Sequence, residues 1–255
     1  MKTNLLTIKT IYSQLISIFK QNTRGFLSLV SGFFIILIVR MLLSIVDTIF
    51  IANEFPIQRI IFMLSTALLV VGIEMGYNKL IFNIIDNDEA SLSTVFNYFN
   101  LLGQYIIGQL IYCLIVVLVC LPSIIYIVLQ YGNKFFEVIY HSILDPYFQE
   151  LVTSYFNVNE LFIILFLLLI PGIYIAIRLS FWLYFIIDKK LTGQEAIKHS
   201  WLLTKGKAGE ILIIGLCLIV LNIIGLISII GICFTAPVSY LFFCLYYRYL
   251  LANQE

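Results

Sequence analysis

Long apolar runs separated by short polar segments make up most of the chain. A helix needs about 20 apolar residues to cross a hydrocarbon layer about 30 Å thick. Six runs meet this length, at residues 26–51, 60–77, 101–129, 161–187, 211–230 and 232–251. These runs lack the alternation of apolar and polar positions that barrel strands show. The pattern therefore predicts an all-α, polytopic transmembrane bundle of six helices, forming one membrane domain over residues 1–255.

The connection between the last two runs is a single residue, Gly231. So short a connection predicts a tight antiparallel hairpin, in which Gly225 and Gly231 allow the chain to turn.

The N-terminal residues 1–24 form an amphipathic segment. Within residues 4–20, one helical stripe collects the apolar side chains, namely Leu5, Ile8, Tyr12, Leu15, Ile16 and Phe19. This pattern predicts a surface helix that either lies on the inner leaflet or packs beneath the bundle. We do not interpret it as a signal peptide, because the first long apolar run begins only at Phe26 and no small-residue cleavage site follows it.

Composition and charge support a membrane location and orient the bundle. The chain is 62% hydrophobic and 11% charged, whereas soluble domains are usually about 25% charged. With six spans and both termini in the cytoplasm, eleven of the fifteen lysines and arginines lie on the cytoplasmic side and two on the outer side. Basic residues are retained on the cytoplasmic side of short loops, so this orientation is the expected one.

The cytoplasmic connector, residues 188–210, carries the clearest local signals. Thr192 and Glu195 fit a capping box, which predicts a short helix beginning at Gly193. Ser200 lies on one face of that helix with Ala196, Ile197 and Trp201, and Gly206, after Lys205, is expected to close the helix. We expect this helix to lie flat beneath the membrane, and a second short amphipathic segment to follow the second span.

Four charged residues lie within or at the rim of the predicted spans: Arg40, Asp47, Glu74 and Arg178. A charge at the bilayer centre costs on the order of 3 kcal/mol or more, so each is expected to be paired and to face the bundle or water. From depth along the helices we pair Arg178 with Glu74. Arg40 is left to polar groups of neighbouring spans, drawn from Ser65, Thr66, Gln104, Gln109 and Asn222. Two interpretations stay open: structural pairing, or a polar cavity beside a span interrupted at Pro171 and Gly172.

The predicted outer loop, residues 131–160, contains a polar cluster. Glu137, His141 and Asp145 recur every fourth residue, which places three potential metal ligands on one helical face. Three ligands strung along about 12 Å of one helix cannot all bind one ion, so a solvated face is the preferred interpretation and no metal or cofactor is expected.

The five cysteines all fall inside apolar runs without C-x-x-C spacing and are interpreted as small buried hydrophobes.

The C-terminal hundred residues carry a recognisable pattern. It comprises "IPGIYIAIRLSFWLYFIID", "EAIKHSWLLTKGK" and "GLISIIGICFTAPVSYLFFCLYYRYL". In these stretches the chain resembles a family of uncharacterised six-helix bacterial membrane proteins, related to the membrane domain fused to some glycerophosphodiester phosphodiesterases. The resemblance rests on Pro171, Gly172, Asp188, Glu195 to Ile197, Ser200, Lys205, Gly206, Gly231, Pro237 and Tyr246. It implies a topology and a bacterial cytoplasmic membrane, but no phosphodiesterase activity, because no soluble catalytic domain is present.

No catalytic motif stands out in the sequence. Neither histidine lies near a nucleophile signature, and there is no phosphate-binding loop or thiolate metal framework. We therefore expect a non-enzymatic membrane scaffold or accessory subunit that binds membrane lipids or a partner membrane protein, with no nucleic-acid partner. The alternative is a permease or exporter of a small amphiphile. A lipid-modifying enzyme that uses the outer-loop cluster is a remote third hypothesis.

Overall fold

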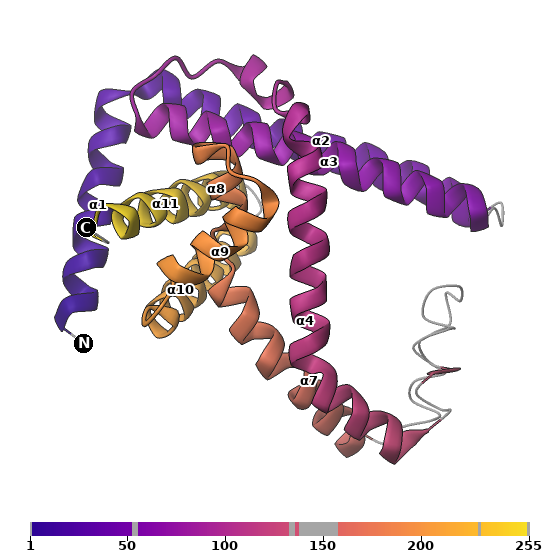
Figure 1. Cartoon of the computed structure of the whole chain (residues 1–255). Coiled ribbons are helices and arrows are strands. Elements are labelled where there is room, and N and C mark those ends of the chain that lie inside the picture. Colours follow the sequence, from indigo (N-terminus) through magenta and orange to yellow (C-terminus); the bar gives the residue numbers. More distant parts are fainter. Residues whose placement is uncertain (1, 53–55, 133–135, 138–157, 229–230, 254–255) are drawn as a thin grey trace.

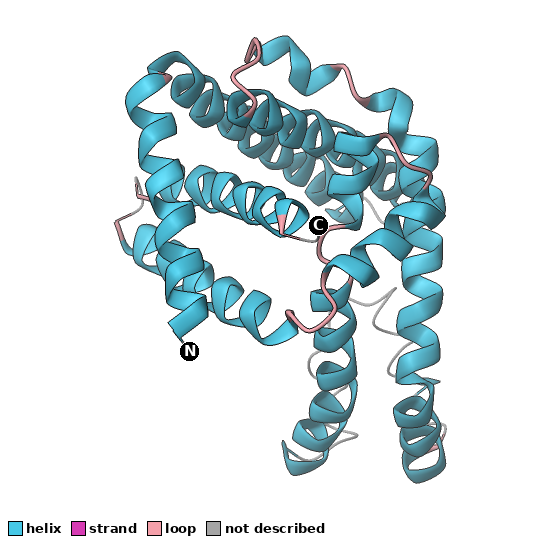
Figure 2. Cartoon of the chain, turned by 60° about the vertical axis from the view of Figure 1, so that its left-hand side comes forward, coloured by secondary structure: helices cyan, strands magenta, loops and turns pink. Residues whose placement is uncertain are grey.

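The computed structural model describes the chain except residues 1, 53–55, 133–135, 138–157, 229–230 and 254–255 (Figure 1). All regular structure within the described residues is helical, which confirms the all-α class (Figure 2). The helices are α1 (Lys2–Gln21), α2 (Thr23–Ala52), α3 (Pro56–Ile85), α4 (Leu102–Tyr131), α7 (Val158–Arg178), α8 (Trp182–Lys189), α9 (Gly193–Leu203), α10 (Ala208–Ile227) and α11 (Ile232–Ala252). Two short 3-10 helices, η1 (Leu92–Phe96) and η2 (Phe99–Leu101), connect α3 to α4.

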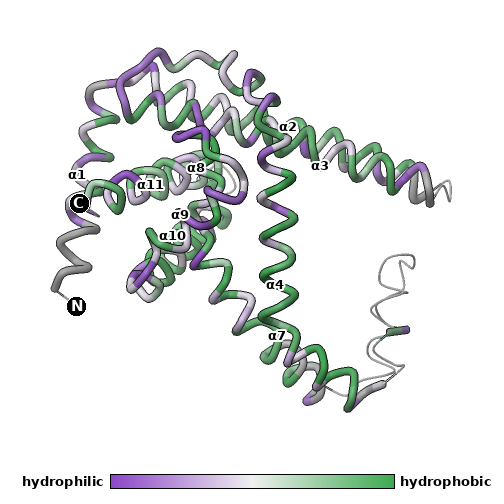
Figure 3. Tube along the Cα trace, viewed as in Figure 1, coloured by the Kyte–Doolittle hydropathy of each residue, from purple (hydrophilic) through white to green (hydrophobic). Residues whose placement is uncertain are grey.

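Five helical segments in the described part of the chain are long and apolar enough to cross a membrane. They are Thr23–Ile49, Gln58–Ile85, Leu92–Gln130, Phe166–Lys189 and Ala208–Ile227. These segments suggest a multi-pass membrane protein, and they appear as long hydrophobic stretches in Figure 3. The sixth expected span corresponds to α11, which is tyrosine-rich and is not among the five.

The long helices pair into hairpins that diverge from one another. Helices α2 and α3 pack against each other, as do α4 with α7 and α10 with α11, whereas α3 and α4 touch only briefly. In Figure 1 the hairpin of α2 and α3 extends away from the hairpin of α4 and α7, and both project from a common centre.

The buried core lies at one end of these hairpins. Its side chains come from α1, the first half of α2, the second half of α3, η1, the end of α7, most of α8, α9, the beginning of α10 and the second half of α11. Tyr77, Phe82, Phe181 and Tyr247 are among its largest fully buried members, and the ring of Tyr247 contacts those of Phe82 and Phe181 at tilted angles. All these segments lie at the end that the charge pattern assigns to the cytoplasm.

Helix α1 belongs to this core. It packs against α11 and α2, and Ile11 and Leu15 are buried there, whereas Tyr12 is exposed. Of the two interpretations left open by the sequence, the structure therefore favours a helix packed beneath the bundle. Of the predicted stripe, Leu15 is buried and Tyr12 is exposed, whereas the side chains of Leu5 and Ile8 lie outside the described part of the chain.

The hairpin of α10 and α11 was predicted correctly, and the structure gives a different reason for its glycines. A Cβ atom at Gly225 would overlap the side chain of Thr235, and one at Gly231 would overlap Ser228 and approach the backbone of Gly225. Gly231 itself has an ordinary helical φ of −61°. Both glycines are thus required for close approach rather than for unusual backbone angles.

The predicted fourth span needs two corrections. Residues 161–187 do not form one continuous helix, because a turn at residues 179–181 separates α7 from α8. In addition, α7 continues through Pro171 and Gly172, so these residues do not interrupt it. The chain breaks seven residues later, directly after Arg178.

Candidate functional site

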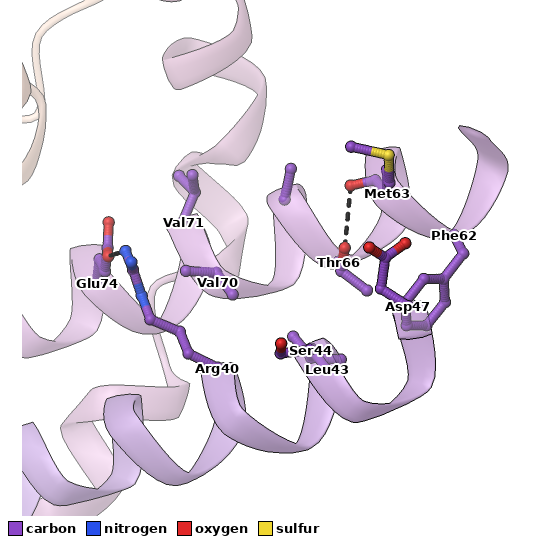
Figure 4. A pocket seen from close by; sticks show the side chains of 11 residues that line it. Arg40, Leu43, Ser44, Asp47, Phe62, Met63, Thr66, Val70, Val71 and Glu74 are labelled. Carbon is purple, nitrogen blue, oxygen red and sulfur yellow. Dashed lines mark hydrogen bonds and ion pairs between the residues drawn. The ribbon is translucent and has the colours of Figure 1, made fainter. Parts of the chain in front are cut away.

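A polar groove follows the contact between α2 and α3 in the half of the hairpin that projects from the core (Figure 4). It has a volume of about 540 Å³, which is within the range of small-molecule sites. From α2 it is lined by residues at helical spacing, Arg40, Leu43, Ser44 and Asp47. From α3 it is lined by Phe62, Met63, Thr66, Ala67, Val70, Val71 and Glu74.

An ion pair lies at each end of the groove. At the end near the core, a guanidinium nitrogen of Arg40 donates to the Glu74 carboxylate. At the far end, Arg59 Nε donates to Asp47 Oδ1 at 3.1 Å. The sequence located three of these four residues as the intramembrane charges, and Arg59 as an outer basic residue.

The pairing of Arg178 with Glu74 was wrong, because Glu74 is taken by Arg40. Helix α3 continues eight residues beyond the predicted end of the second span, which moves Glu74 to about 16 Å from the C-terminal end of the helix. Helical side chains also lean toward the N-terminus of their own helix. In an antiparallel hairpin, Arg40 and Glu74 therefore lean toward each other, as Figure 4 shows.

The groove is open to its surroundings. The Arg40 side chain is 56% exposed and Glu74 26%. Arg40 is paired, as expected, but its partner is Glu74 rather than the uncharged polar groups that the sequence suggested. Ile73 and Met75, on either side of Glu74, are buried in the core. This end of the groove thus lies where the α2 and α3 hairpin leaves the core.

Arg178 is buried, with an exposed fraction of 6%, and its contacts are with α9. Its guanidinium donates to the backbone oxygen of Trp201 at 2.7 Å, and its Cζ atom lies 4.3 Å from the centre of the Trp201 ring. Trp201 belongs to the last turn of α9, and Arg178 to the last turn of α7. Carbonyl groups at helix C-termini carry partial negative charge, so two helix ends and one aromatic ring stabilise this cation.

The side chains of Ser200 in α9 and of Thr204, directly after α9, explain why α7 ends at Arg178. Thr204 Oγ1 donates to the Arg178 backbone oxygen at 2.8 Å, and Ser200 Oγ donates to the same oxygen at 3.3 Å. Ser200 Oγ also accepts from the Phe181 backbone nitrogen. The sequence analysis singled out Ser200 and missed Thr204. Thr204 follows Ser200 by four residues, and this spacing could have indicated that the two side chains lie on the same side of the chain.

The corrected pairing can be tested with a double-mutant cycle. The effects of Arg40→Gln and Glu74→Gln on the free energy of unfolding should be non-additive, because the two residues share an ion pair. The effects of Arg178→Gln and Glu74→Gln should instead add to within about 0.5 kcal/mol. Unfolding in detergent micelles measures both cycles. Non-additive effects of Arg178→Gln and Glu74→Gln would contradict this result and support the pairing that the sequence predicted.

The capping box in the connector is confirmed. Thr192 Oγ1 accepts from the Glu195 backbone nitrogen, and the Glu195 carboxylate accepts from the Thr192 backbone nitrogen. Helix α9 begins at Gly193 as predicted. It ends at Leu203, and the exposed Lys205 and Gly206 form the turn that follows, in which Gly206 has a φ of +73°.

Thr192→Ala should reduce the free energy of unfolding by about 1 kcal/mol, because the start of α9 loses its cap. Gln194→Ala, at an exposed position of the same turn, is the control and should have little effect.

The hydrogen bonds from Thr192 lower the pKa of Glu195. A carboxyl group with a lowered pKa adds stability above its ordinary pKa, and this contribution disappears as the pH falls through the lowered value. The stability difference between the native chain and Glu195→Gln should therefore narrow in acid.

A second ion-pair cluster, missed from the sequence, joins three helices at the core end. Arg248 on α11 contacts Asp86, just after α3, at 2.7 Å and Asp188 on α8 at 2.8 Å. Asp188 is buried, with a side-chain exposure of 6%, and also lies near Lys189 and the Tyr247 hydroxyl. The three partners are far apart in sequence, so no local spacing indicated them.

The outer-loop cluster falls mostly outside the described residues. Glu137 is described and exposed, whereas His141 and Asp145 are not described. Among the described residues, no three His, Cys, Asp or Glu side chains gather as a metal site would require. The cysteine interpretation was only partly right, since Cys120 and Cys244 are buried but Cys113 and Cys217 are exposed on their helices.

Comparisons of this chain with protein-family models, with curated proteins and with solved structures find no match.

Proposed function

We propose that the chain is a non-catalytic scaffold or accessory subunit of a bacterial cytoplasmic membrane, which binds membrane lipids or a partner membrane protein. In this proposal α11 is a sixth span and both termini lie in the cytoplasm. The resemblance of the C-terminal hundred residues to six-helix bacterial membrane proteins supports this topology. The position of the core at the basic end of the hairpins also supports it.

One observation carries the proposal. Two ion pairs lie in the apolar hairpin of α2 and α3, and the other described residues leave their four side chains between 26% and 56% exposed. Exposing such charges to hydrocarbon is costly, on the order of 3 kcal/mol for a charge at the bilayer centre. A protein or lipid that covers this face removes that cost, so the face is suited to binding within the membrane.

Extraction into lipid nanodiscs directly from the native membrane tests this proposal. The native chain should retain a component at fixed stoichiometry, and the charge-free variant Arg40→Gln with Glu74→Gln should lose it. Asp86→Asn, which changes a charge at the opposite end of α3, is the control and should retain it. A chain that carries no stoichiometric component would contradict the proposal.

A permease for a small amphiphile is the second candidate, and the groove favours it. Its volume of about 540 Å³ and its mixture of charged, hydroxyl and apolar groups suit an amphiphilic ligand. Arg178 lies against α9 and does not line the groove. Arg40 is therefore the charged residue on which transport through the groove would depend. In reconstituted vesicles, transport should then be lost in Arg40→Gln while assembly is unchanged, and the absence of any flux would exclude this candidate.

A further inference from the structure

Among the described residues of the projecting hairpin, all the charged side chains gather on one face. This charged face consists of Arg40, Ser44 and Asp47 on α2 and Arg59, Thr66, Ala67 and Glu74 on α3. Most other exposed positions in this half of the hairpin are large and apolar, namely Met41, Leu42, Ile45, Val46, Ile49, Ile60, Ile61, Leu64, Leu68 and Leu69. Thr48, Gln58 and Ser65 are also exposed there, and they are polar but uncharged. Lipid chains can cover the apolar positions, but they offer no partner to the guanidinium and carboxylate groups.

We propose that the charged face is the contact between two copies of this chain. The inference rests on the proposed function and deepens it by naming the partner as a second copy. It follows from how the charges are arranged, because the face is complementary to itself.

The geometry of a membrane dimer makes this complementarity specific. Two copies inserted in the same direction are related by a two-fold axis along the membrane normal, so equal depths face each other. Such an axis places α2 of one copy opposite α3 of the other. Arg40 then faces the second copy's Glu74, and Asp47 faces the second copy's Arg59. Each ion pair becomes a neutral ring of four alternating charges.

The residues between the two ion pairs permit close packing. Ser44, Thr66 and Ala67 are small, and small residues allow helices to approach closely in membranes. The flexible side chain of Met63, which is 51% exposed at the groove, is suited to fill the space left there. The guanidinium of Arg40 can donate to two carboxylates at once, because it carries five N–H donors and Glu74 uses one side of it.

Co-expression of two differently tagged copies tests the proposal by charge exchange. Native copies should co-isolate from mild detergent or nanodiscs. Copies that all carry Arg40→Glu should not associate, because the ring would then be entirely negative. Copies that all carry Glu74→Arg should not associate, because it would be entirely positive. Co-expressing one copy of each variant should restore association, since their ring is neutral again.

A purely intramolecular ion pair predicts the opposite for the mixture. Each variant chain keeps its like-charge pair, so co-expression would restore nothing. Failure of the mixed variants to associate, with both chains inserted and folded, would overturn the proposal, as would a monomeric native chain.

A crosslinking experiment without charge changes keeps the proposal testable if those variants fail to fold. All native cysteines lie outside α2 and α3. Ser44→Cys in one copy should crosslink to Ala67→Cys in the other more efficiently than to a second Ser44→Cys, because α2 faces α3. Leu42→Cys with Leu69→Cys, on the apolar side, is the control and should not crosslink. Equal crosslinking of Ser44→Cys to Ala67→Cys and to a second Ser44→Cys would overturn the proposal. A native chain that is monomeric but retains another protein or a lipid would refute the dimer and leave the proposed function intact.

Discussion

Arg248→Met is expected to reduce the free energy of unfolding by about 3 to 5 kcal/mol, because it leaves the buried Asp188 carboxylate without its guanidinium partner. Removing one member of a buried ion pair costs more than the pair contributes, since the remaining charge stays desolvated. Lys189, at 3.5 Å from Asp188, is half exposed and compensates only in part. Unfolding in detergent micelles, followed by circular dichroism, measures the loss.

Two companion variants separate this cause from a loss of packing. Asp86→Asn removes the more exposed partner of Arg248 and should cost less than about 1 kcal/mol. Arg248→Met with Asp188→Asn should recover part of the stability, because no buried charge remains. If the double variant were less stable than Arg248→Met alone, packing of the arginine against Phe82 would be the main contribution.

Gly193→Ala is expected to have the second large effect. A Cβ atom at this position would overlap the backbone oxygen of Gln104 and the backbone nitrogen of Gly108, and would lie 2.9 Å from the Gly108 Cα atom. Backbone atoms cannot rotate away, so α9 would have to separate from α4. Overpacking of this kind typically costs about 1 to 3 kcal/mol and occasionally more.

Gly209→Ala is the matched control, because a Cβ atom there meets no atom within 4 Å. It should be neutral or slightly stabilising, since alanine favours helix over glycine by up to about 1 kcal/mol. Comparing the two variants by thermal unfolding isolates the contact of α9 with α4. Equal stability of the two would show that this contact is looser than the structure indicates.

The sequence predicted the helical class, the approximate positions of the long helices and the start of α9. These features depend on local patterns: run length for the spans and the spacing of Thr192 and Glu195 for the cap. The angles between the hairpins could not be predicted from such local patterns. Hydropathy indicates whether a helix is stable in lipid, but it contains no information on which helices contact one another.

The candidate site was predicted in its residues but not in its pairing. Arg40, Asp47 and Glu74 stand out because charges are rare in apolar runs, whereas their partners depend on where each helix ends. The hydropathy pattern did not predict that α3 continues to Ile85, because this part of the helix contains polar residues such as Asn78 and Lys79. The burial of Arg178 against α9 depends on carbonyl groups and a tryptophan, which no charge-pairing rule includes.

Spin labels on opposite sides of α2 test the central claim most directly, namely that the projecting hairpin lies in lipid and that protein covers its charged face. Labels would be attached at Leu42→Cys and Ser44→Cys in nanodiscs, with oxygen as the lipid-soluble relaxing agent and a nickel chelate as the water-soluble one. The label at residue 42 should respond to oxygen, and the label at residue 44 should be shielded from both agents. Equal oxygen response at the two positions, or access of the nickel chelate to either, would contradict the account.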